Sequence, residues 1–292
     1  GYENNKKCEW YFWWTVERCK EIDPKPIVML CRDTVIRGDA VSFLKDERYK
    51  TLEVIQTWSV DSCQTWLAGW GHVLDNYPEA ERIVQIPGDI DFVAEDVAFY
   101  DNLGRFIETT TSDIVIGDFR TGDQYSAKSL VDTYGTYSLL ANWFPEISRS
   151  IRSLPLNRPR SEFINIKTSV LRDLIINNRN FAYEQTLNFL IRCWNNDETK
   201  WRYDIAQSFL GTLSDNKSFR SYRACIDQIE RTERMLSLLW REIKAPKKKD
   251  TVSDKEFEKQ YIVFSNEYDT LCTKSKGIMD TARTTLRALL GV

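Results

Sequence analysis

Short apolar runs alternate with amphipathic stretches in the N-terminal part of the chain, and this alternation constrains the fold more than any other feature of the sequence. The strand-like runs lie at 27–31, 52–58, 82–87 and 113–117. The helix-like stretches between them lie at 38–48, 61–77 and 94–107. Strands that alternate with helices through short links build right-handed βαβ units. We therefore expect an α/β domain with a doubly wound, mostly parallel sheet and helices on both of its faces.

The pattern changes twice along the chain and predicts three parts. Residues 1–24 hold the aromatic run Trp10–Trp14 and end at two prolines, which predicts a short helical segment on a domain surface. Residues 25–196 carry the α/β alternation, which continues with a helix at 124–143, a strand at 161–166, and helices at 168–176 and 181–195. Residues 197–292 have helical spacing only and predict a C-terminal all-helical module, with helices at 201–211, 217–243 and 254–290.

The composition argues against several classes of function. Forty basic and 43 acidic residues give a net charge of −3, so no overall positive field recruits nucleic acid. No apolar run approaches the roughly 18 residues of a membrane-spanning helix. The sequence contains neither a P-loop nor the Gly-x-Gly-x-x-Gly fingerprint of dinucleotide-binding proteins. His72 is the one histidine, which excludes two-histidine zinc sites and argues against a Ser-His-Asp triad.

The seven cysteines are widely spaced and include no Cys-x-x-Cys pair. This pattern argues against a zinc site or a redox couple and predicts thiols that are mostly buried and reduced. Reduced thiols are typical of a reducing compartment, so we expect the protein to act in the cytoplasm.

Asp89 and Asp91 follow the apolar run 82–87 after a Pro-Gly break. Ligands of doubly wound sheets bind beyond the carboxyl ends of the strands, and an extended backbone there turns both carboxylates to the same side. Two like charges in such a place are costly unless a cation lies between them. Mg²⁺ or Mn²⁺, bound by carboxylates and phosphate oxygens, fits this requirement. The alternative is a pair of capping carboxylates that face solvent or a helix N-terminus.

The run Val84–Asp91, read with 52–61 and with Ser112–Gly117, resembles the GT-A glycosyltransferases of the family 2 type. Members of that family carry an Asp-x-Asp at the end of a central strand, followed by a helix and a further strand. The resemblance continues in Ser161–Leu171 and in Phe181–Glu184, and it covers about two thirds of the chain. It implies a GT-A fold and the transfer of a sugar from a nucleotide diphosphate sugar to an acceptor. The acceptor would be a sugar, a small metabolite or a polyprenyl phosphate.

The resemblance also implies a set of binding residues. Asp89 and Asp91 would hold Mn²⁺ or Mg²⁺, which stabilises the negative charge that develops on the leaving nucleotide. Residues 31–33 and Asp61 match positions that hold the base and the ribose, although Asp61 is the only acid kept from the family's motif after the second strand. The nucleotide-sugar site is therefore expected to include Cys31, Arg32, Asp33, Asp61, Gly88 and Asp89.

Glu184 lies where family members place an acidic residue near the acceptor. An inverting transfer needs a base within reach of the acceptor hydroxyl, and the resemblance implies this role for Glu184. Alternatively, Glu184 opens the helix 181–195 and only stabilises the positive end of the helix dipole. Asp118, which directly follows the run 113–117, is the second candidate for the base.

Several cationic side chains lie on segments that we expect to be irregular. Arg158 and Arg160 precede a strand, and their guanidinium groups could clamp a diphosphate or an anionic acceptor through paired hydrogen bonds. Glu162 lies in the segment Ser161–Leu171 that resembles the family, and we expect it to contact the acceptor together with these arginines. Arg120 and Lys128 flank a flexible turn and would contact the nucleotide sugar in the same way. The alternative for these segments is an exposed, solvated loop.

The C-terminal helices and the loop between them suggest further partners. Apolar residues such as Ile226, Leu236 and Leu239 form one stripe, which would pack on the sheet or on another subunit, and we expect a homo-oligomer through these helices. The lysine-rich loop 244–250, together with the aromatic residues 10–14, could make a peripheral contact with an anionic membrane. The alternative is a solvated loop between two helices.

Two other functions stay open. A nucleotidyltransferase shares the α/β sheet and the acidic metal site, but it normally carries a Gly-rich signature with Lys or Arg after its first strand. Here Arg32–Asp39 contains a single glycine. A non-catalytic interaction protein would instead use the helices of 197–292 as its working surface, on a degenerate GT-A scaffold.

Overall fold

The chain forms two compact units. The computed structural model describes residues 13, 15–22, 26–30, 45, 47–57, 62–87, 97–109, 111–121, 127–154, 156, 158–176, 185–213, 221–248 and 251–292. One unit, here called the α/β unit, comprises Gly1–Arg120, Ser161–Cys193 and Trp201–Ser214. The other, here called the helical unit, comprises Thr121–Arg160, Trp194–Lys200 and Asp215–Val292. The segment after Arg120 thus belongs with the C-terminal helices, and Trp201–Ser214 belongs with the sheet.

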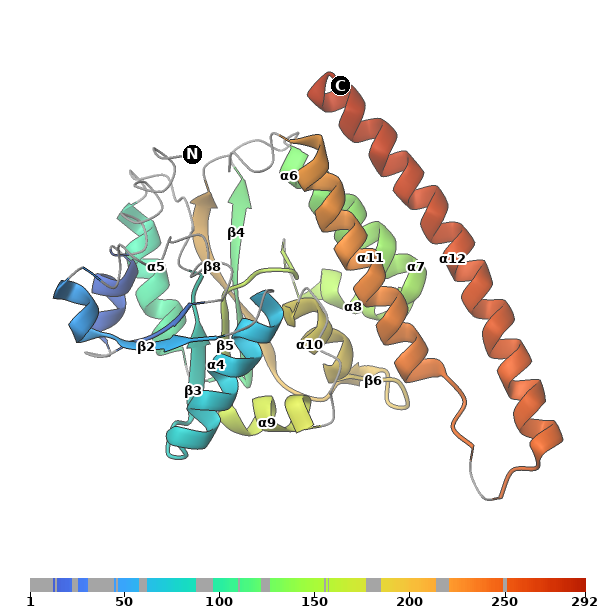
Figure 1. Cartoon of the computed structure of the whole chain (residues 1–292), viewed down its shortest axis with the longest axis horizontal. Helices are drawn as coiled ribbons and strands as arrows, with labels where there is room; N and C mark the ends of the chain where they lie inside the picture. The colour runs from blue at the N-terminus through green and yellow to red at the C-terminus, as the bar shows by residue number, and fades with distance from the viewer. Residues whose placement is uncertain are drawn as a thin grey trace. The chain divides into compact units, whose positions relative to one another are not determined.

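Four described strands of the α/β unit form a sheet in the order β3, β5, β4, β8. Their bounds are β3 Arg82–Gln85, β4 Ile114–Thr121, β5 Ile164–Lys167 and β8 Ile205–Leu213. Strand β5 lies between β3 and β4 and runs antiparallel to both. It follows that β3 and β4 run in the same direction and that their carboxyl ends lie at one edge of the sheet (Figure 1). The strands predicted at 82–87, 113–117 and 161–166 are confirmed within a few residues.

Strand β8 corrects the helix that the sequence pattern predicted at 201–211. Gly211 has a φ of 138°, which no residue of an α-helix adopts. Ala206 and Leu210 pack on one face of the sheet, as the two-residue period of a strand requires. The spacing of Ile205, Phe209 and Leu210 fits a helix equally well, and this ambiguity misled the prediction.

A second, two-stranded part of the α/β unit is parallel. It pairs β1 Ile27–Leu30 with β2 Glu53–Gln56, and Ile27 lies opposite Glu53. This unit also contains η1 Glu47–Thr51, α4 Ser62–Asn76, α5 Val97–Glu108, α9 Thr168–Ile176 and α10 Gln185–Cys193. The unit therefore has the mixed α/β fold expected from the sequence, with a parallel pair of strands and one antiparallel strand inside the larger sheet.

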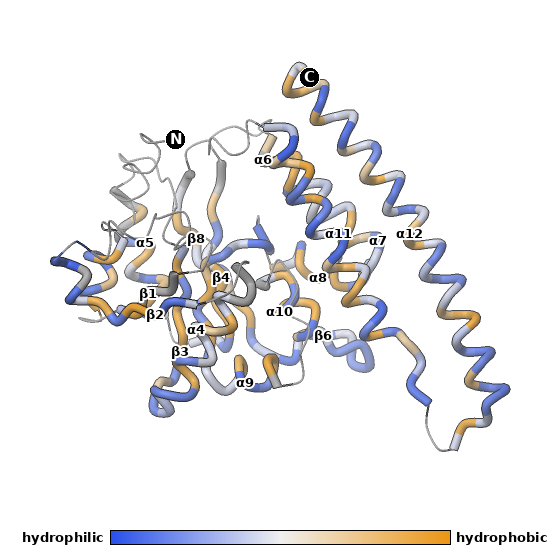
Figure 2. The backbone as a smooth tube through the Cα atoms, in the orientation of Figure 1, coloured by the Kyte–Doolittle hydropathy of each residue, from blue (hydrophilic) through white to orange (hydrophobic). Residues whose placement is uncertain are grey.

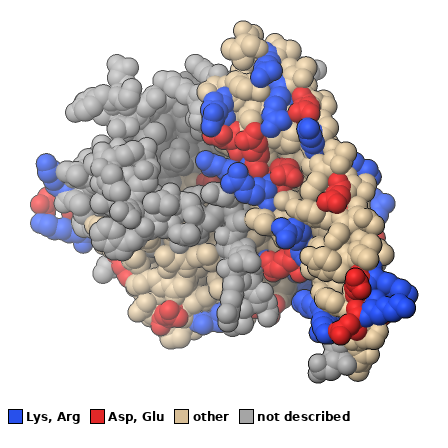
Figure 3. Space-filling model, turned by 45° about the vertical axis from the view of Figure 1, so that its right-hand side comes forward, with Lys and Arg blue, Asp and Glu red and all other residues tan. Residues whose placement is uncertain are grey.

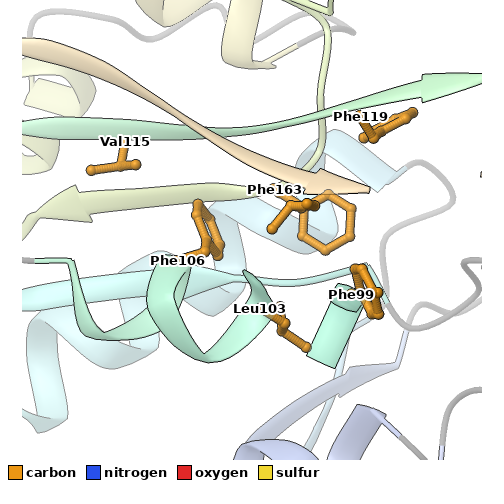
Figure 4. Packing of buried hydrophobic residues seen from close by; sticks show 7 residues of the cluster. Phe99, Leu103, Phe106, Val115, Phe119 and Phe163 are labelled. Carbon is orange, nitrogen blue, oxygen red and sulfur yellow. The ribbon is translucent and has the colours of Figure 1, made fainter. Parts of the chain in front are cut away.

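Rings fill the core between α5 and the four-stranded sheet (Figure 4). The ring of Phe163 meets those of Phe106 and Phe119 edge to face, with centroids 6.1 and 6.2 Å apart. Aromatic pairs prefer this geometry. The cluster consists of Phe99, Leu103, Phe106, Val115, Phe119, Phe163 and Leu210. Since side chains alternate along a strand, Ile114, Ile116 and Asp118 lie on the opposite face of β4 from Val115 and Phe119.

Gly117 lets β4 approach this core. A Cβ atom at position 117 would lie 2.5 Å from Phe163 Cβ and 2.7 Å from Leu210 Cδ1, closer than carbon atoms pack. We expect Gly117→Ala to lower the free energy of unfolding by about 3 kcal/mol, because the buried side chains of Phe163 and Leu210 would have to move. Chemical denaturation measures this loss.

Gly71→Ala on α4 is the matched control. A Cβ atom there meets nothing within 4 Å. Alanine should therefore stabilise the protein by about 0.5–1 kcal/mol through its higher helix propensity. Equal effects of the two substitutions would contradict the packing described for β4.

The helical unit confirms the helices predicted at 124–143, 217–243 and 254–290. It is built from α6 Ala127–Asp132, the π-helical η2 Thr133–Ser138, α7 Leu139–Trp143, α8 Pro145–Ser153, α11 Tyr222–Lys244 and α12 Asp254–Leu290. The short strands β6 Trp194–Asn195 and β7 Lys200–Trp201 flank a turn. Hydrophilic and hydrophobic residues alternate along α12 with the period of the helix (Figure 2). Among the described helices, none has the length and apolar character that a bilayer crossing requires.

Aromatic stacking and an ion pair hold α11 against α12. Trp240 stacks on Phe264 with ring centroids 5.3 Å apart and an interplanar angle of 13°. Towards the other end, Arg283 Nη2 lies 3.0 Å from Glu230 Oε1. The apolar stripe predicted on α11 therefore packs largely within the helical unit.

Candidate functional site

The carboxyl-terminal edge of the four-stranded sheet is held together by backbone and side-chain hydrogen bonds. Gln85, the last residue of β3, donates from Nε2 to the carbonyl oxygen of Glu162 at 2.9 Å. The backbone N–H of Gly117 in β4 donates to the carbonyl oxygen of Phe163 at 3.0 Å. The residues that lead into β5 therefore lie between the ends of β3 and β4, and we call this place the sheet edge.

Ser161 connects three segments at the sheet edge. Its side chain is buried, donates to the carbonyl oxygen of Gly117 and accepts a hydrogen bond from the N–H of Phe163 at 3.2 Å. The hydroxyl of Thr186, in the first turn of α10, donates to the carbonyl oxygen of Ser161. A buried and fully bonded serine of this kind fixes the backbone around it. The start of α10 is thus tied to β4.

Asp118 lies in the carboxyl-terminal half of β4 and is 0% exposed. Its Oδ2 accepts a hydrogen bond of 2.7 Å from Nε2 of Gln207 in β8. Burial of a carboxylate is costly unless the group is hydrogen-bonded or paired with a cation. The burial of Asp118 near the carboxyl end of a sheet strand therefore depends on hydrogen bonds such as the one from Gln207.

The acid at the opposite end of β4 has a structural role by comparison. Asp113 lies 2.8 Å from Lys167 Nζ and accepts a hydrogen bond of 2.9 Å from the backbone N–H of Asp204. The hydrogen bond from Lys167, followed by that from Asp204, lowers the pKa of Asp113 below its usual value. Its oxygens hold β4, β5 and the start of β8 together. Asp113 is thus a paired surface acid, whereas Asp118 is a buried one.

Most of the predicted site residues lie outside the part of the chain that the structure describes. These are Cys31, Arg32, Asp33, Asp61, Gly88, Asp89, Asp91 and Glu184. For Arg120 in β4 and Lys128 in α6 the structure describes the backbone but not the side chain. Their predicted roles stay predictions. Within the described ranges, no three acidic, histidine or cysteine side chains form a group that could hold a metal ion.

The predicted acceptor-side residues lie in both units. In the helical unit, Arg158 is 7% exposed and its Nη1 pairs with Oδ2 of Asp132. The alternative of an exposed, solvated loop is therefore wrong for Arg158. Arg160 is half-buried next to Gly135, where a Cβ atom would lie 3.2 Å from its Nη1. Glu162 belongs to the α/β unit, and its side chain is exposed.

Gln207 is the site residue that sequence reasoning missed. It lies in the segment predicted to be helical, where a glutamine carries no signal of function. Ala206, Ser208 and Leu210 lie at every second position before Gly211. This period of two residues could have indicated a strand. Its pairing with Asp118, 89 positions earlier, is a long-range contact that local patterns do not contain.

Charged side chains of both signs are mixed on the surface of the described residues. On the face shown in Figure 3, basic and acidic side chains are interspersed over the described residues and form no single basic area. A face that binds a nucleic-acid backbone is typically a continuous basic patch. The described residues on this face therefore form no such patch.

Comparisons with known proteins give one structural likeness. Neither the models of protein families nor the curated proteins match the chain. Among solved structures, the chain is similar to mannosyl-3-phosphoglycerate synthase from Rubrobacter xylanophilus, with 10% sequence identity and a TM-score of 0.38. The similarity covers 81% of this chain and 80% of that one.

Proposed function

We propose that the protein is a metal-dependent glycosyltransferase that moves a sugar from a nucleotide diphosphate sugar to an acceptor. One observation carries the proposal. Strands β3 and β4 run in the same direction, so their carboxyl ends lie at the same edge of the sheet. The segment after β3 contains Asp89 and Asp91, and β4 carries the buried Asp118. Acidic residues at or beyond the carboxyl ends of sheet strands are typical of a nucleotide and metal site.

The proposed chemistry assigns a role to each carboxylate. Asp89 and Asp91 would hold Mn²⁺ or Mg²⁺, because their oxygens are the ligands that these hard cations prefer. When bound, the cation would supply positive charge to the leaving diphosphate. Glu184 would accept the proton of the acceptor hydroxyl. Asp118 would place a fixed negative charge beside the sugar, whose transferring carbon becomes positive in the transition state, and it is the second candidate for the base.

Turnover of donor sugars tests the proposal. The purified chain would be incubated with uridine, guanosine, adenosine and cytidine diphosphate sugars, with Mn²⁺, with Mg²⁺ and with EDTA. We expect release of nucleoside diphosphate from at least one donor with a metal ion and none with EDTA. In parallel thermal-shift measurements, the matching nucleoside diphosphate should raise Tm only when the metal ion is present. Stabilisation by nucleoside triphosphates alone would favour a nucleotidyltransferase, and no response to any nucleotide would favour the non-catalytic interaction protein.

An exposed part of α12 supports a second proposal, a homo-oligomer through the helical unit. Tyr261, Ile262 and Val263 are 51%, 53% and 66% exposed. They lie on a helix whose neighbouring rings already pack against α11. Consecutive exposed apolar residues are unusual on a helix that faces only water. Sedimentation velocity distinguishes a second copy of the chain from binding to anionic vesicles, the membrane contact considered above.

The described cysteines support the proposed cytoplasmic location. Cys193 is a buried free thiol. Burial raises the pKa of Cys193 to about 12, so this thiol stays protonated and unreactive at neutral pH. Buried thiols without disulfide partners are typical of proteins that work in a reducing compartment.

A further inference from the structure

We propose that Gln207 is a positioning residue for Asp118. The inference rests on the proposed function and deepens it, because it names a residue that orients the Asp118 carboxylate. The observation that supports it directly is the hydrogen bond of 2.7 Å that Gln207 Nε2 donates to Asp118 Oδ2. The two residues lie on neighbouring strands, β8 and β4, of the same sheet.

The two side chains share a face of the sheet. Ala206 and Leu210 pack in the aromatic core, so Gln207 projects from the opposite face of β8. Asp118 projects from the same face, because its neighbour Phe119 lies in the core. The contact is thus a cross-strand pair on the face away from α5, and not a chance meeting of two loops.

The strand that carries Gln207 is firmly held on both sides of it. Ile205 and Leu210 are 9% and 0% exposed. The carbonyl oxygen of Leu210 accepts a hydrogen bond of 3.3 Å from Asn102 Nδ2 of α5. A donor on such a strand holds its acceptor in one orientation, as a site with preorganised charge requires.

An amide suits this role better than a cation would. The amide N–H of Gln207 donates to one carboxylate oxygen and brings no positive charge of its own. Lys167 does the opposite at Asp113, where it forms an ion pair. Gln207 therefore fixes the direction of the Asp118 carboxylate without placing a positive charge of its own beside it.

The first test measures the contact without any activity. Gln207→Met keeps the length of the side chain and removes the donor, and Asp118→Leu removes the acceptor at similar volume. In a double-mutant cycle of equilibrium unfolding, we expect the two substitutions to be coupled by about fivefold in the unfolding equilibrium constant. Ser208→Ala, on the other face of β8, should show no coupling to Asp118→Leu. Additive effects of Gln207→Met and Asp118→Leu would overturn the inference.

The second test measures turnover. We expect Gln207→Met to lower kcat about tenfold, with less than a twofold change in the KM of the donor, whereas Ser208→Ala leaves both unchanged. In the Asp118→Leu background, Gln207→Met should have no further effect on kcat. An unchanged kcat in Gln207→Met, or an equal loss in both backgrounds, would contradict a role through Asp118. A wild-type chain without turnover on any donor would contradict the proposed function alone, and the unfolding cycle would still decide whether Gln207 holds Asp118.

Discussion

Replacing Asp91 with alanine is expected to weaken the metal-dependent binding of a nucleoside diphosphate by about 100-fold or more. The reason is electrostatic. The diphosphate is an anion, and next to Asp89 and Asp91 it would be repelled unless a divalent cation lies between the charges. Without the second carboxylate the cation binds weakly, and the nucleotide loses the charge that holds it. Isothermal titration calorimetry with the nucleoside diphosphate and Mn²⁺ measures the loss.

A matched control separates this effect from a change in overall charge. Asp101 is exposed on α5, and Asp101→Ala removes the same charge at a residue that has no assigned role in binding. This variant should bind the nucleotide as the wild type does. Both variants should keep the wild-type melting temperature without ligand. If Asp91→Ala binds the nucleotide with unchanged affinity and unchanged dependence on Mn²⁺, Asp91 is not a ligand of the cation.

Replacing Glu184 with glutamine is expected to lower kcat by about 10²–10⁴-fold while the donor still binds. Glutamine has nearly the same shape but cannot take the proton of the acceptor hydroxyl. Asp118→Asn should lower kcat less, by about tenfold to 100-fold, because it removes a charge that stabilises the transition state but leaves the base in place. Steady-state kinetics and calorimetry on both variants check this order.

The reverse order would reassign the base to Asp118, the second candidate. The alternative role of Glu184 at a helix terminus makes a different prediction, namely a lower melting temperature with normal turnover. Comparing turnover with melting temperature for the same variant therefore distinguishes the two roles of Glu184.

The strands that build the sheet edge could be predicted because their sequences are nearly continuous apolar runs. Strands β3 and β4 were found in this way, and they run in the same direction, so their carboxyl ends lie at the same edge of the sheet. Strand β5 was also found, but its antiparallel direction was not. The order and direction of strands depend on pairings between distant segments, such as Ile116 with Ile164, which local spacing does not encode.

Other features could not be predicted for related physical reasons. The apolar residues of β8 fit either a helix or a strand, so Gln207 was not recognised. The burial of Arg158 depends on its ion pair with Asp132, a residue 26 positions earlier on another element. From the sequence alone, isolated cationic residues in a Pro-rich segment are expected to be exposed to solvent. Only the fold shows that the Arg158 side chain is buried.

The binding of Mn²⁺ itself tests the central claim most directly. Free Mn²⁺ has a strong electron paramagnetic resonance signal that broadens when the ion is bound. With a nucleoside diphosphate that the chain binds, we predict that the wild type removes about one equivalent of this signal per chain and that the double variant Asp89→Asn, Asp91→Asn removes no more than the nucleotide does alone. Equal loss of the signal with both proteins, or no loss with the wild type, would contradict a metal-dependent site at these two aspartates.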